Sequence, residues 1–483
     1  MPPRVDLMNA PQRLTSFVDG SAIDHEGAVL DLIRPQDGVK TASLVEAGSA
    51  GVERAVISAR AAFLAHRKSS LHQRAAWLRS AASMLTADVD RIATLISEDV
   101  GKPIRIARIE TRRGAEFMEA CAGIALTCGG EVIPLDAAQN GAGRFGFTRR
   151  VPYGVVAGIT PFNAPVNLLI QKVAPAIAAG NSIVVKPAPS GTRTALALAD
   201  LFVRSGWPRG MFNVVTGDRD TALALAAHTD VGAVSFTGGT SAGEALVRAA
   251  GVKKFVSELG SNAANIVMAD ADVTDAALKI AAAAFEASGQ QCISAQRVLV
   301  ARSVFDAFLH AFTTAASKLK VGAADDPTTD LGPMVHRASA DRVVGMIDDA
   351  VSGGATFALK PRQEGCTLSP AILVNVATNS RLWNEEVFGP VAIVHPFDGI
   401  DEALRLANDS PFGLQGAVFT SSLATAMRFS EDFDVGALWI NEASRFRLDM
   451  YPFGGMKMSG TGREGVRYAI EELSQIKFTG IKS

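Results

Sequence analysis

GVVAGIT (residues 154–160) is the first of five short apolar segments, and SIVVK (182–186), FNVVTG (212–217), VGAVSFTGG (231–239) and KKFVSELG (253–260) follow it. Apolar runs of this length, rich in Val and Ile, predict buried β-strands. The segments between them have helical patterning and cover residues 167–180, 192–206, 220–228 and 241–251. Strands that alternate with helices predict a doubly wound α/β fold around a parallel sheet.

Chemically distinctive residues stand where these predicted strands end. Asn163 follows the first strand, Lys186 ends the second, the FTGG turn (236–239) ends the fourth and Glu258 ends the fifth. Ligands of open α/β sheets bind beyond the carboxyl ends of the strands. We therefore expect these residues to face a common crevice.

The regions on either side extend this pattern. Residues 50–125 are expected to be mostly helical, and residues 131–152 contain strand-like pieces around an Asn140-Gly141 turn, which predicts a hairpin. A second α/β series starts near Asn262 and continues to ALWIN (437–441). The final segment EELSQIKFTG (471–480) predicts an edge strand that could join the 131–152 hairpin.

The composition excludes several classes of protein. The chain has 483 residues, which predicts two or more domains, and 48% of them are hydrophobic. A formal net charge of -2 gives no reason to expect nucleic acid or a membrane surface as a partner. The four dispersed cysteines, the N-terminus without an apolar signal core and the scattered histidines favour a cytoplasmic protein that requires no metal.

Cys292 is the strongest candidate for a nucleophile. It lies in ASGQQCISAQR (287–297), beyond a predicted helix and among small polar residues that suit an accessible loop. Cysteine is a good nucleophile at neutral pH because part of it is already thiolate. The plain structural alternative is a buried small hydrophobe.

Glu258 and Asn163 are candidates to assist the thiol. A partly buried carboxylate at a strand end would have a raised pKa and could act as a general base. The amide of Asn163, in TPFNAP (160–165), could donate to a developing oxyanion together with a backbone N–H. A surface glutamate and a turn-forming asparagine are the structural alternatives.

Other residues suit a dinucleotide. Lys186 could bond ribose hydroxyls, and the FTGG turn leads into a helix whose N-terminus could receive a pyrophosphate. Glu386 could bind a ribose diol and Phe388 could pack on a nicotinamide, both in EEVFGP (385–390). Each signal is weak alone, because none of them is a GxGxxG fingerprint.

The order of TPFN, VVKP, FTGG, ELG, GQQC, EEVFGP and PFGG resembles the NAD(P)-dependent aldehyde dehydrogenase superfamily over residues 18–477, and 34 residues separate Glu258 from Cys292, as in that family. The resemblance implies a Rossmann-like cofactor domain (1–130 and 153–257), a second α/β catalytic domain (258–465) and a small β-flap (131–152 and 466–483). The flap would build homodimers or homotetramers.

The resemblance also implies the chemistry. Cys292 would attack an aldehyde, Asn163 would hold the oxyanion, and Glu258 would direct water onto a thioester. Contacts to NAD or NADP are expected from Ile159, Thr160, Pro161, Lys186, Ala188, Pro189, Ser190, Thr216, Phe236, Thr237, Gly238, Gly239, Leu259, Gly260, Glu386 and Phe388.

Three positions depart from the family pattern. Pro189 stands where many NAD-preferring members carry a glutamate that binds the adenosine ribose, and Ser190 adds a hydroxyl, so we predict that NADP is tolerated and even preferred. Gly239 replaces a serine, which removes one phosphate contact. Ser261-Asn262 replaces a common Gly-Lys pair, a change that nothing in the sequence explains.

The C-terminal stretch NEASRFRLDMYPFGG (441–455) resembles the subgroup that acts on phosphonoacetaldehyde, sulfolactaldehyde and glyceraldehyde 3-phosphate. Arg447 falls where that subgroup places an anion-binding arginine, which predicts a small anionic aldehyde as substrate. Gln291, where some phosphate-binding relatives carry arginine, and Ala164, where the phosphonoacetaldehyde enzymes carry histidine, argue against it. The expected substrate contacts are Phe162, Arg112, Arg113, Gln291, Ile293, Arg447 and Phe453.

Three alternatives stay open. Phe162 and Phe446 would suit a neutral aromatic or aliphatic aldehyde. A CoA-acylating enzyme would pass the thioester to CoA, although relatives of that kind lack a base such as Glu258. A binding protein that has lost its chemistry is disfavoured by the intact set of Cys292, Glu258 and Asn163.

Overall fold

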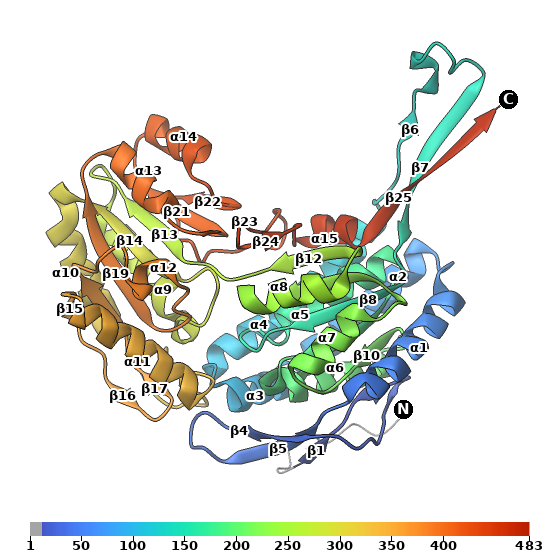
Figure 1. Ribbon diagram of the computed structural model, residues 1–483, viewed down its shortest axis with the longest axis horizontal. Helices are drawn as coiled ribbons and strands as arrows, with labels where there is room; N and C mark the ends of the chain where they lie inside the picture. The colour runs from blue at the N-terminus through green and yellow to red at the C-terminus, as the bar shows by residue number, and fades with distance from the viewer. Residues whose placement is uncertain (1–11, 483) are drawn as a thin grey trace.

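The computed structural model of the protein describes residues 12–482. Residues 1–11, which hold much of the N-terminal stretch considered for a secretory signal, lie outside this range. Two α/β bodies lie side by side, and an arm projects from one of them (Figure 1). No helix within residues 12–482 is long and apolar enough to cross a membrane.

The first body is built on an eight-stranded sheet with the order β24-β12-β11-β8-β9-β10-β2-β3. The five predicted strands are its centre and run parallel to one another, which confirms the doubly wound α/β prediction. Antiparallel strands close both edges. The strands of this sheet are β2 (Phe17–Val18), β3 (Ser21–Ala22), β8 (Val155–Thr160), β9 (Ser182–Pro187), β10 (Phe212–Val214), β11 (Val231–Thr237), β12 (Lys254–Glu258) and β24 (Gly460–Thr461).

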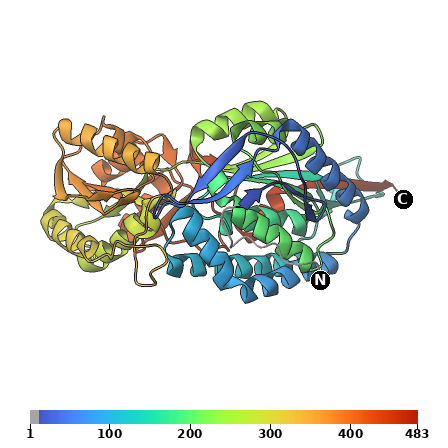
Figure 2. The ribbon, with the colours of Figure 1, turned by 90° about the horizontal axis from the view of Figure 1, so that it is seen from below.

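Helices cover both faces of this sheet (Figure 2). Helices α5 and α6 pack on one face with α2, α3, α4 and α15 outside them, and α1, α7 and α8 pack on the other. Their bounds are α1 (Gly48–His66), α2 (Leu71–Ala87), α3 (Val89–Val100), α4 (Ile104–Ala125), α5 (Asn167–Ala179), α6 (Thr192–Arg204), α7 (Arg219–Ala227), α8 (Thr240–Ala250) and α15 (Val466–Glu472).

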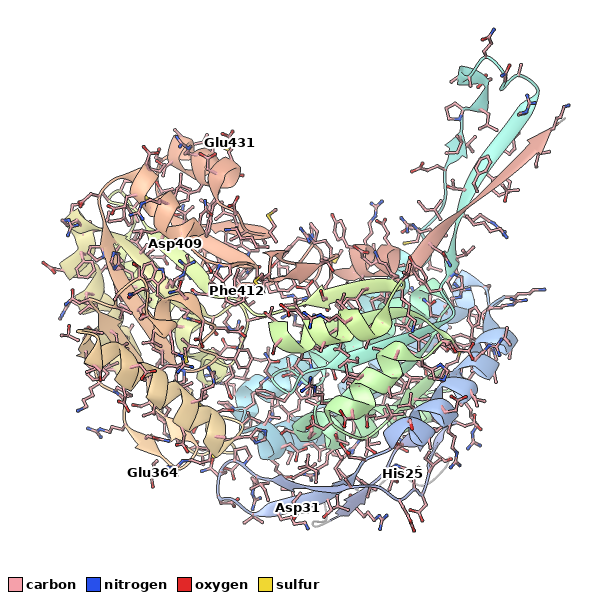
Figure 3. The ribbon with its side chains drawn as sticks, in the orientation of Figure 1. His25, Asp31, Glu364, Asp409, Phe412 and Glu431 are labelled. Carbon is pink, nitrogen blue, oxygen red and sulfur yellow. The ribbon has the colours of Figure 1, made fainter. Side chains whose placement is uncertain are left out.

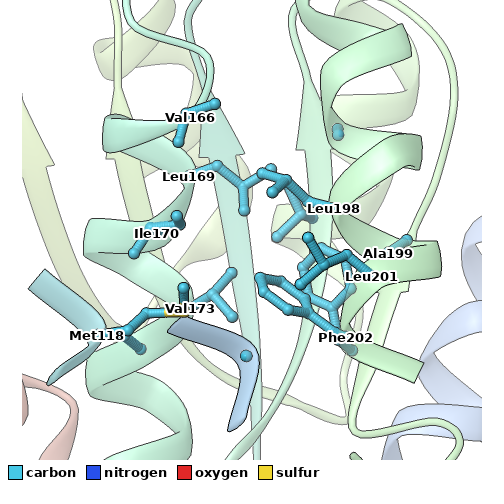
Figure 4. Close-up of a cluster of buried hydrophobic side chains, with 14 of the residues drawn as sticks. Met118, Val166, Leu169, Ile170, Val173, Leu198, Ala199, Leu201 and Phe202 are labelled. Carbon is cyan, nitrogen blue, oxygen red and sulfur yellow. The ribbon is translucent and has the colours of Figure 1, made fainter. Parts of the chain in front are cut away.

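Helix α5 is the centre of the larger core. All of its residues are buried, because it lies between the sheet and the outer helices. Leu169 and Val173 of α5 meet Leu198 and Phe202 of α6, and Met118 of α4 closes the cluster (Figure 4). Each such side chain contributes roughly 1.5–3 kcal/mol by leaving water. The loop before α5 and the strand ends beside it are therefore held on a rigid base.

The second body has a seven-stranded sheet with the order β15-β18-β19-β14-β13-β21-β22, parallel except for β15 at one edge. Its strands are β13 (Ala263–Val267), β14 (Ala295–Ala301), β15 (Thr356–Leu359), β18 (Ala371–Val374), β19 (Val391–Phe397), β21 (Gln415–Phe419) and β22 (Ala437–Ile440). Its helices are α9 (Val273–Phe285), α10 (Phe305–Ser317), α11 (Arg337–Ser352), α12 (Arg381–Asn384), α13 (Ile400–Asn408) and α14 (Leu423–Asp432). Two-stranded ladders join β16 (Gln363–Glu364) to β17 (Thr367–Leu368) and β20 (Phe412–Gly413) to β23 (Met456–Lys457).

The arm consists of β6 (Val132–Ile133), β7 (Arg144–Pro152) and β25 (Ser474–Lys482) and stands clear of the body (Figure 3). Strand β25 pairs with β7 along its whole length, as the sequence suggested. The hairpin of β6 and β7 is present, and Asn140 and Gly141 lie in a turn in which the N–H of Gly141 donates to the Ala138 carbonyl oxygen at 2.8 Å. The two strands are nevertheless joined by more than this turn. The connection is longer because the 3-10 turn Leu135–Ala137 precedes it and Gly143 takes the left-handed φ of 69°.

Strand β24 brings the C-terminal part of the chain back to the first sheet. The resemblance implies a catalytic domain over residues 258–465. Within that range, Gly460 pairs with Glu258 at the edge of the first sheet. A Cβ on Gly460 would lie 2.0 Å from the carbonyl oxygen of Ser257, so only glycine permits this approach. A separate small sheet of β1 (Gln12–Leu14), β4 (Val29–Ile33) and β5 (Lys40–Val45) covers the base of the first body.

Candidate active site

Cys292 lies in the loop between the 3-10 turn Glu286–Gly289 and β14. Three consecutive residues of that turn, Ala287, Ser288 and Gly289, have left-handed φ values of 51°, 58° and 66°. This conformation costs about 1–3 kcal/mol for each residue that is not glycine, so its surroundings must hold it in place.

Contacts from distant segments hold this turn. The Ser288 hydroxyl donates to the carbonyl oxygen of Gly332 at 2.7 Å, and the Gln290 side chain accepts the N–H of Val335 at 3.1 Å. A Cβ on Gly289 would lie 2.1 Å from the carbonyl oxygen of Gly389. The position of the thiol is therefore fixed by tertiary contacts rather than by local preference.

Asn163 is held beside the Cys292 loop. Its loop connects β8 to α5, and its Nδ2 donates to the carbonyl oxygen of Gln290 at 2.9 Å. An amide nitrogen carries two N–H groups, and the second has no partner among residues 12–482 and suits a ligand. Asn163 and Cys292 line the same small cavity of about 120 Å³, which we call the thiol cavity.

Glu258 is the last residue of β12 and is 2% exposed. Within residues 12–482, neither of its carboxyl oxygens has a hydrogen-bond partner. Burial, and then the charge of Glu464, raise the pKa of Glu258 well above its usual value. This environment therefore favours the protonated carboxyl over the carboxylate in the ligand-free protein.

A layer of paired charges lies behind Glu258. The ammonium of Lys172 donates to Thr237 Oγ1 at 2.7 Å and to Glu464 at 3.1 Å. Arg447 donates to the other oxygen of Glu464 at 3.0 Å and stacks 3.6 Å above the ring of Phe453. Burial opposes ionisation of Glu464, but Lys172 and Arg447 hold its pKa below the usual value. The ionised form of Glu464 is thus favoured, whereas at Glu258 the protonated form is favoured.

Ionisation of the Cys292 thiol is also disfavoured in the ligand-free protein. Burial raises the pKa of Cys292 to about 12, and the charges of Glu386 and Glu258 act in the same direction. The nucleophile therefore has to lose a proton to a neighbouring group when the substrate arrives.

A larger hollow of about 410 Å³ lies beyond the carboxyl ends of β8, β9 and β11, and we call it the strand-end cleft. Ten of the residues expected to contact the cofactor line it: Ile159, Thr160, Pro161, Lys186, Ala188, Pro189, Phe236, Thr237, Gly238 and Gly239. Burial lowers the pKa of Lys186 to about 8, and its ammonium donates a long 3.4 Å hydrogen bond to the Asp218 carbonyl oxygen.

The remaining expected cofactor residues lie outside the lining of this cleft. Ser190 lies within 3.3 Å of His336 Nε2, and the hydroxyl of Thr216 donates to the Val45 carbonyl oxygen at 2.6 Å. Leu259 packs in the core under α8. Thr216 and Leu259 thus have structural contacts that account for them.

The charge of Glu386 reaches Cys292 and raises the pKa of the thiol. The Glu386 carboxylate accepts the N–H of Ser261 at 3.0 Å and flanks Gly260. Burial raises the pKa of Glu386 to about 7. Phe388 has a left-handed φ of 50° and meets Phe162 edge to face at 5.9 Å between ring centres.

The expected substrate residues divide into two groups. Arg113, Gln291, Ile293 and Arg447 line the thiol cavity with Cys292 and Asn163. Arg112 is exposed on α4 outside this lining, Phe162 lines two neighbouring hollows, and Phe453 lies beneath Arg447.

The aldehyde dehydrogenase family profile matches residues 23–479. The chain belongs to this family. It is 40% identical to the 3-sulfolactaldehyde dehydrogenase of Priestia megaterium over 425 residues, which cover 88% of this chain and 89% of that protein. It is 36% identical to aspartate-semialdehyde dehydrogenase 1 of Pseudomonas canavaninivorans, over 93% of this chain and 95% of that protein. Among solved structures, the NADP-dependent glyceraldehyde-3-phosphate dehydrogenase of Bacillus halodurans, in complex with NADP, is similar with a TM-score of 0.95 and 32% identity, over 97% of this chain and 99% of that one.

As a member of the aldehyde dehydrogenase family, the chain is an oxidoreductase that acts on aldehydes with NAD or NADP. The strand-end cleft fits such a dinucleotide. Gly239 caps the N-terminus of α8 with open space around it, and Ser241 and Ala242 of the first turn line the cleft. A helix N-terminus of this kind suits a pyrophosphate, and the buried Lys186 ammonium suits a ribose or phosphate.

Sequence reasoning missed several residues of this aldehyde dehydrogenase site. Asp218 and Arg219 line the strand-end cleft, and their place directly after the FNVVTG strand could have indicated it. Arg445 lines the thiol cavity and forms an ion pair with Glu286, which also lines it. Sequence distance concealed this pair, because 159 residues separate the two positions. No group of three His, Cys, Asp or Glu residues that could hold a metal ion occurs within residues 12–482.

Proposed function

We propose that the protein oxidises a small anionic aldehyde to its carboxylic acid with NAD or NADP, through a thioester on Cys292. The observation that carries the anionic part is the charge of the thiol cavity. Four basic side chains line it against two carboxylates, and the four are Lys102, Arg113, Arg445 and Arg447. The names of the relatives, which include sulfoacetaldehyde and succinate-semialdehyde dehydrogenases, support this class of substrate.

In the first step Cys292 Sγ bonds to the carbonyl carbon of the aldehyde. The thiol proton leaves to the solvent or to a neighbouring carboxylate, since a pKa of about 12 keeps the resting thiol neutral. The negative charge that develops on the aldehyde oxygen accepts the free N–H of Asn163 Nδ2 and the backbone N–H of Cys292. One such donor contributes about 3 kcal/mol to a transition state.

The oxidised nicotinamide ring supplies the hydride acceptor when a cofactor is bound. Loss of hydride from the tetrahedral adduct leaves a thioester on Cys292. Asn163 and the anchored loop would hold the adduct in one orientation, and Phe388 and Glu386 would contact the nicotinamide and its ribose.

Glu258 then acts on water. In its ionised form it removes a proton from a water molecule, whose oxygen attacks the thioester carbon, and the acid product leaves as Cys292 regains a proton. The absence of any partner for its two oxygens within the described residues leaves both free for water. A raised pKa makes the ionised form a stronger base than an ordinary carboxylate.

A matched pair of aldehydes tests the substrate class. Succinic semialdehyde and its neutral methyl ester have nearly the same shape around the reacting carbonyl. We expect kcat/KM to be about tenfold or more higher for the anion, the size of one hydrogen bond to a charged group. Equal values for the two aldehydes would contradict the proposal.

We further propose that the chain is divided into a cofactor domain (1–130 and 153–257), a catalytic domain (258–465) and a flap (131–152 and 466–483). The flap joins copies of the chain into a dimer or tetramer. Strand β25 is the edge of the arm, and an edge strand offers unpaired backbone groups to another chain. Large apolar side chains are exposed on the arm, among them Val132, Phe145, Ile476, Phe478 and Ile481. Light scattering of the full chain should give the mass of a dimer or tetramer. The double substitution Ile476→Asp and Phe478→Asp should lower that mass. A monomeric wild type would contradict the proposed assembly.

A further inference from the structure

The three arginines of the thiol cavity differ in how firmly each is already paired. Arg113 donates to both oxygens of Asp449, at 2.9 and 2.6 Å. Arg447 is paired with Glu464, a carboxylate that is only 4% exposed and that Lys172 also holds. Arg445 is paired with Glu286, whose side chain is 26% exposed.

The partner of Arg445 can therefore leave more easily than the partner of Arg447. Removing one member of a buried ion pair is costly because the other charge is left without compensation. The side chain of Glu464 is almost fully buried, whereas that of Glu286 already reaches solvent. An incoming anion can replace Glu286 at small cost.

Arg445 also has a hydrogen-bond donor that an incoming ligand can use. Its Nε is buried and has no hydrogen-bond partner among residues 12–482. The Nε of Arg447 is likewise without a partner, but the face of that guanidinium lies against Phe453. Burial, and then the charge of Arg113, lower the pKa of Arg445 to about 10, so it is still charged at neutral pH and lies in a field that favours a second anion.

We propose that Arg445 receives the anionic end of the aldehyde and that Glu286 is an internal competitor that the substrate displaces. Arg447 keeps Glu464 ionised and so positions the charge layer behind Glu258. This inference rests on the proposed anionic substrate and names the side chains that recognise it.

Substitutions at the two ends of the pair have opposite expected effects. Arg445→Gln should raise KM for succinic semialdehyde by about tenfold or more, the loss expected for a hydrogen bond to a charged group, and leave the methyl ester nearly unchanged. Glu286→Gln should lower KM for the anion by a few-fold, because the guanidinium loses its competitor. The double variant should resemble Arg445→Gln alone.

Arg447→Gln is the control. Loss of this cation should lower kcat for both aldehydes and move the alkaline rise of activity to higher pH, because Arg447 opposes the high pKa of Glu258. Arg445→Lys, which keeps the charge, should restore part of the preference and excludes misfolding as the cause.

The outcomes separate the two ideas. If the wild type prefers the anion and Arg445→Gln keeps that preference, the assignment to Arg445 is wrong while the proposed function stands. The assignment is also wrong if Arg447→Gln abolishes the preference selectively, or if Glu286→Gln raises KM for the anion. A wild type without any preference overturns the proposed function and the inference together.

Discussion

The strand-end cleft and the thiol cavity are built in different ways. The cleft is lined by the carboxyl ends of β8, β9 and β11 and by residues of α7 and α8, and its two cations are Lys186 at a strand end and Arg219. The thiol cavity is formed by helices α4 and α5 and by loops from distant parts of the chain, and it is crowded with paired charges. Successive strands of a parallel sheet place their ends at one edge, so the cleft follows from strand order, whereas the cavity depends on how the two bodies meet. Changes to the two should therefore have separable effects.

The largest effect is expected for Cys292→Ala, which removes the nucleophile. Hydride transfer should fall by about 10⁴-fold or more, because no covalent adduct can form. NADH or NADPH absorbance measures the rate, and cofactor binding to the strand-end cleft should be unchanged in a fluorescence titration. A variant that still turns over at a tenth of the wild-type rate would remove Cys292 from the mechanism.

Glu258→Gln should lower steady-state turnover by about 10²–10⁴-fold, the usual contribution of a general base. One equivalent of reduced cofactor should still appear in a burst, and mass spectrometry should detect an acyl group on Cys292.

The pH dependence provides the control for Glu258. Burial raises the pKa of the Glu258 carboxyl well above its usual value, so the ionised fraction of this base increases as the pH rises. Wild-type turnover should therefore increase on the alkaline side. A profile for thioester hydrolysis that is flat from weakly acid to alkaline pH, or a variant without a burst, would exclude this role.

Asn163→Ala should lower kcat by about 10²–10³-fold, as the removal of one oxyanion donor does. The affinity for NADP should stay within twofold, because Asn163 lies outside the lining of the strand-end cleft. Asn163→Asp is the matched variant, since it keeps the size but loses the N–H donor. Wild-type rates in either variant would contradict the oxyanion assignment.

The smallest effect is expected in the cleft. Pro189→Glu introduces a carboxylate beside Lys186, which should reduce the ratio of kcat/KM for NADP over NAD by about tenfold through repulsion of the 2′-phosphate. Wild-type turnover with NADP should be at least a hundredth as efficient as with NAD. The preference for anionic aldehydes, measured with NAD, should not change; if it does, the two regions are coupled rather than separate.

The difference between the two regions also explains which features could be predicted from sequence. The five strands and the residues at their ends, such as Lys186 and Phe236, were predicted correctly because period and apolar content are local properties. The turn at Asn140-Gly141 is present, but the longer connection around it was not predicted, because no local pattern marked the 3-10 turn Leu135–Ala137. Arg445 and its partner Glu286 were missed, because no local pattern joins residues so far apart.

By itself, the sequence determined the doubly wound sheet, the cysteine loop with its polar flanks, and the family to which the chain belongs. Only the tertiary structure decided that residues 287–289 take left-handed φ angles, that Glu258 is buried without a partner among the described residues, and which carboxylate each arginine of the thiol cavity contacts. The physical reason is that burial and electrostatic pairing depend on groups brought together by packing, whereas strand and helix preferences belong to neighbouring residues.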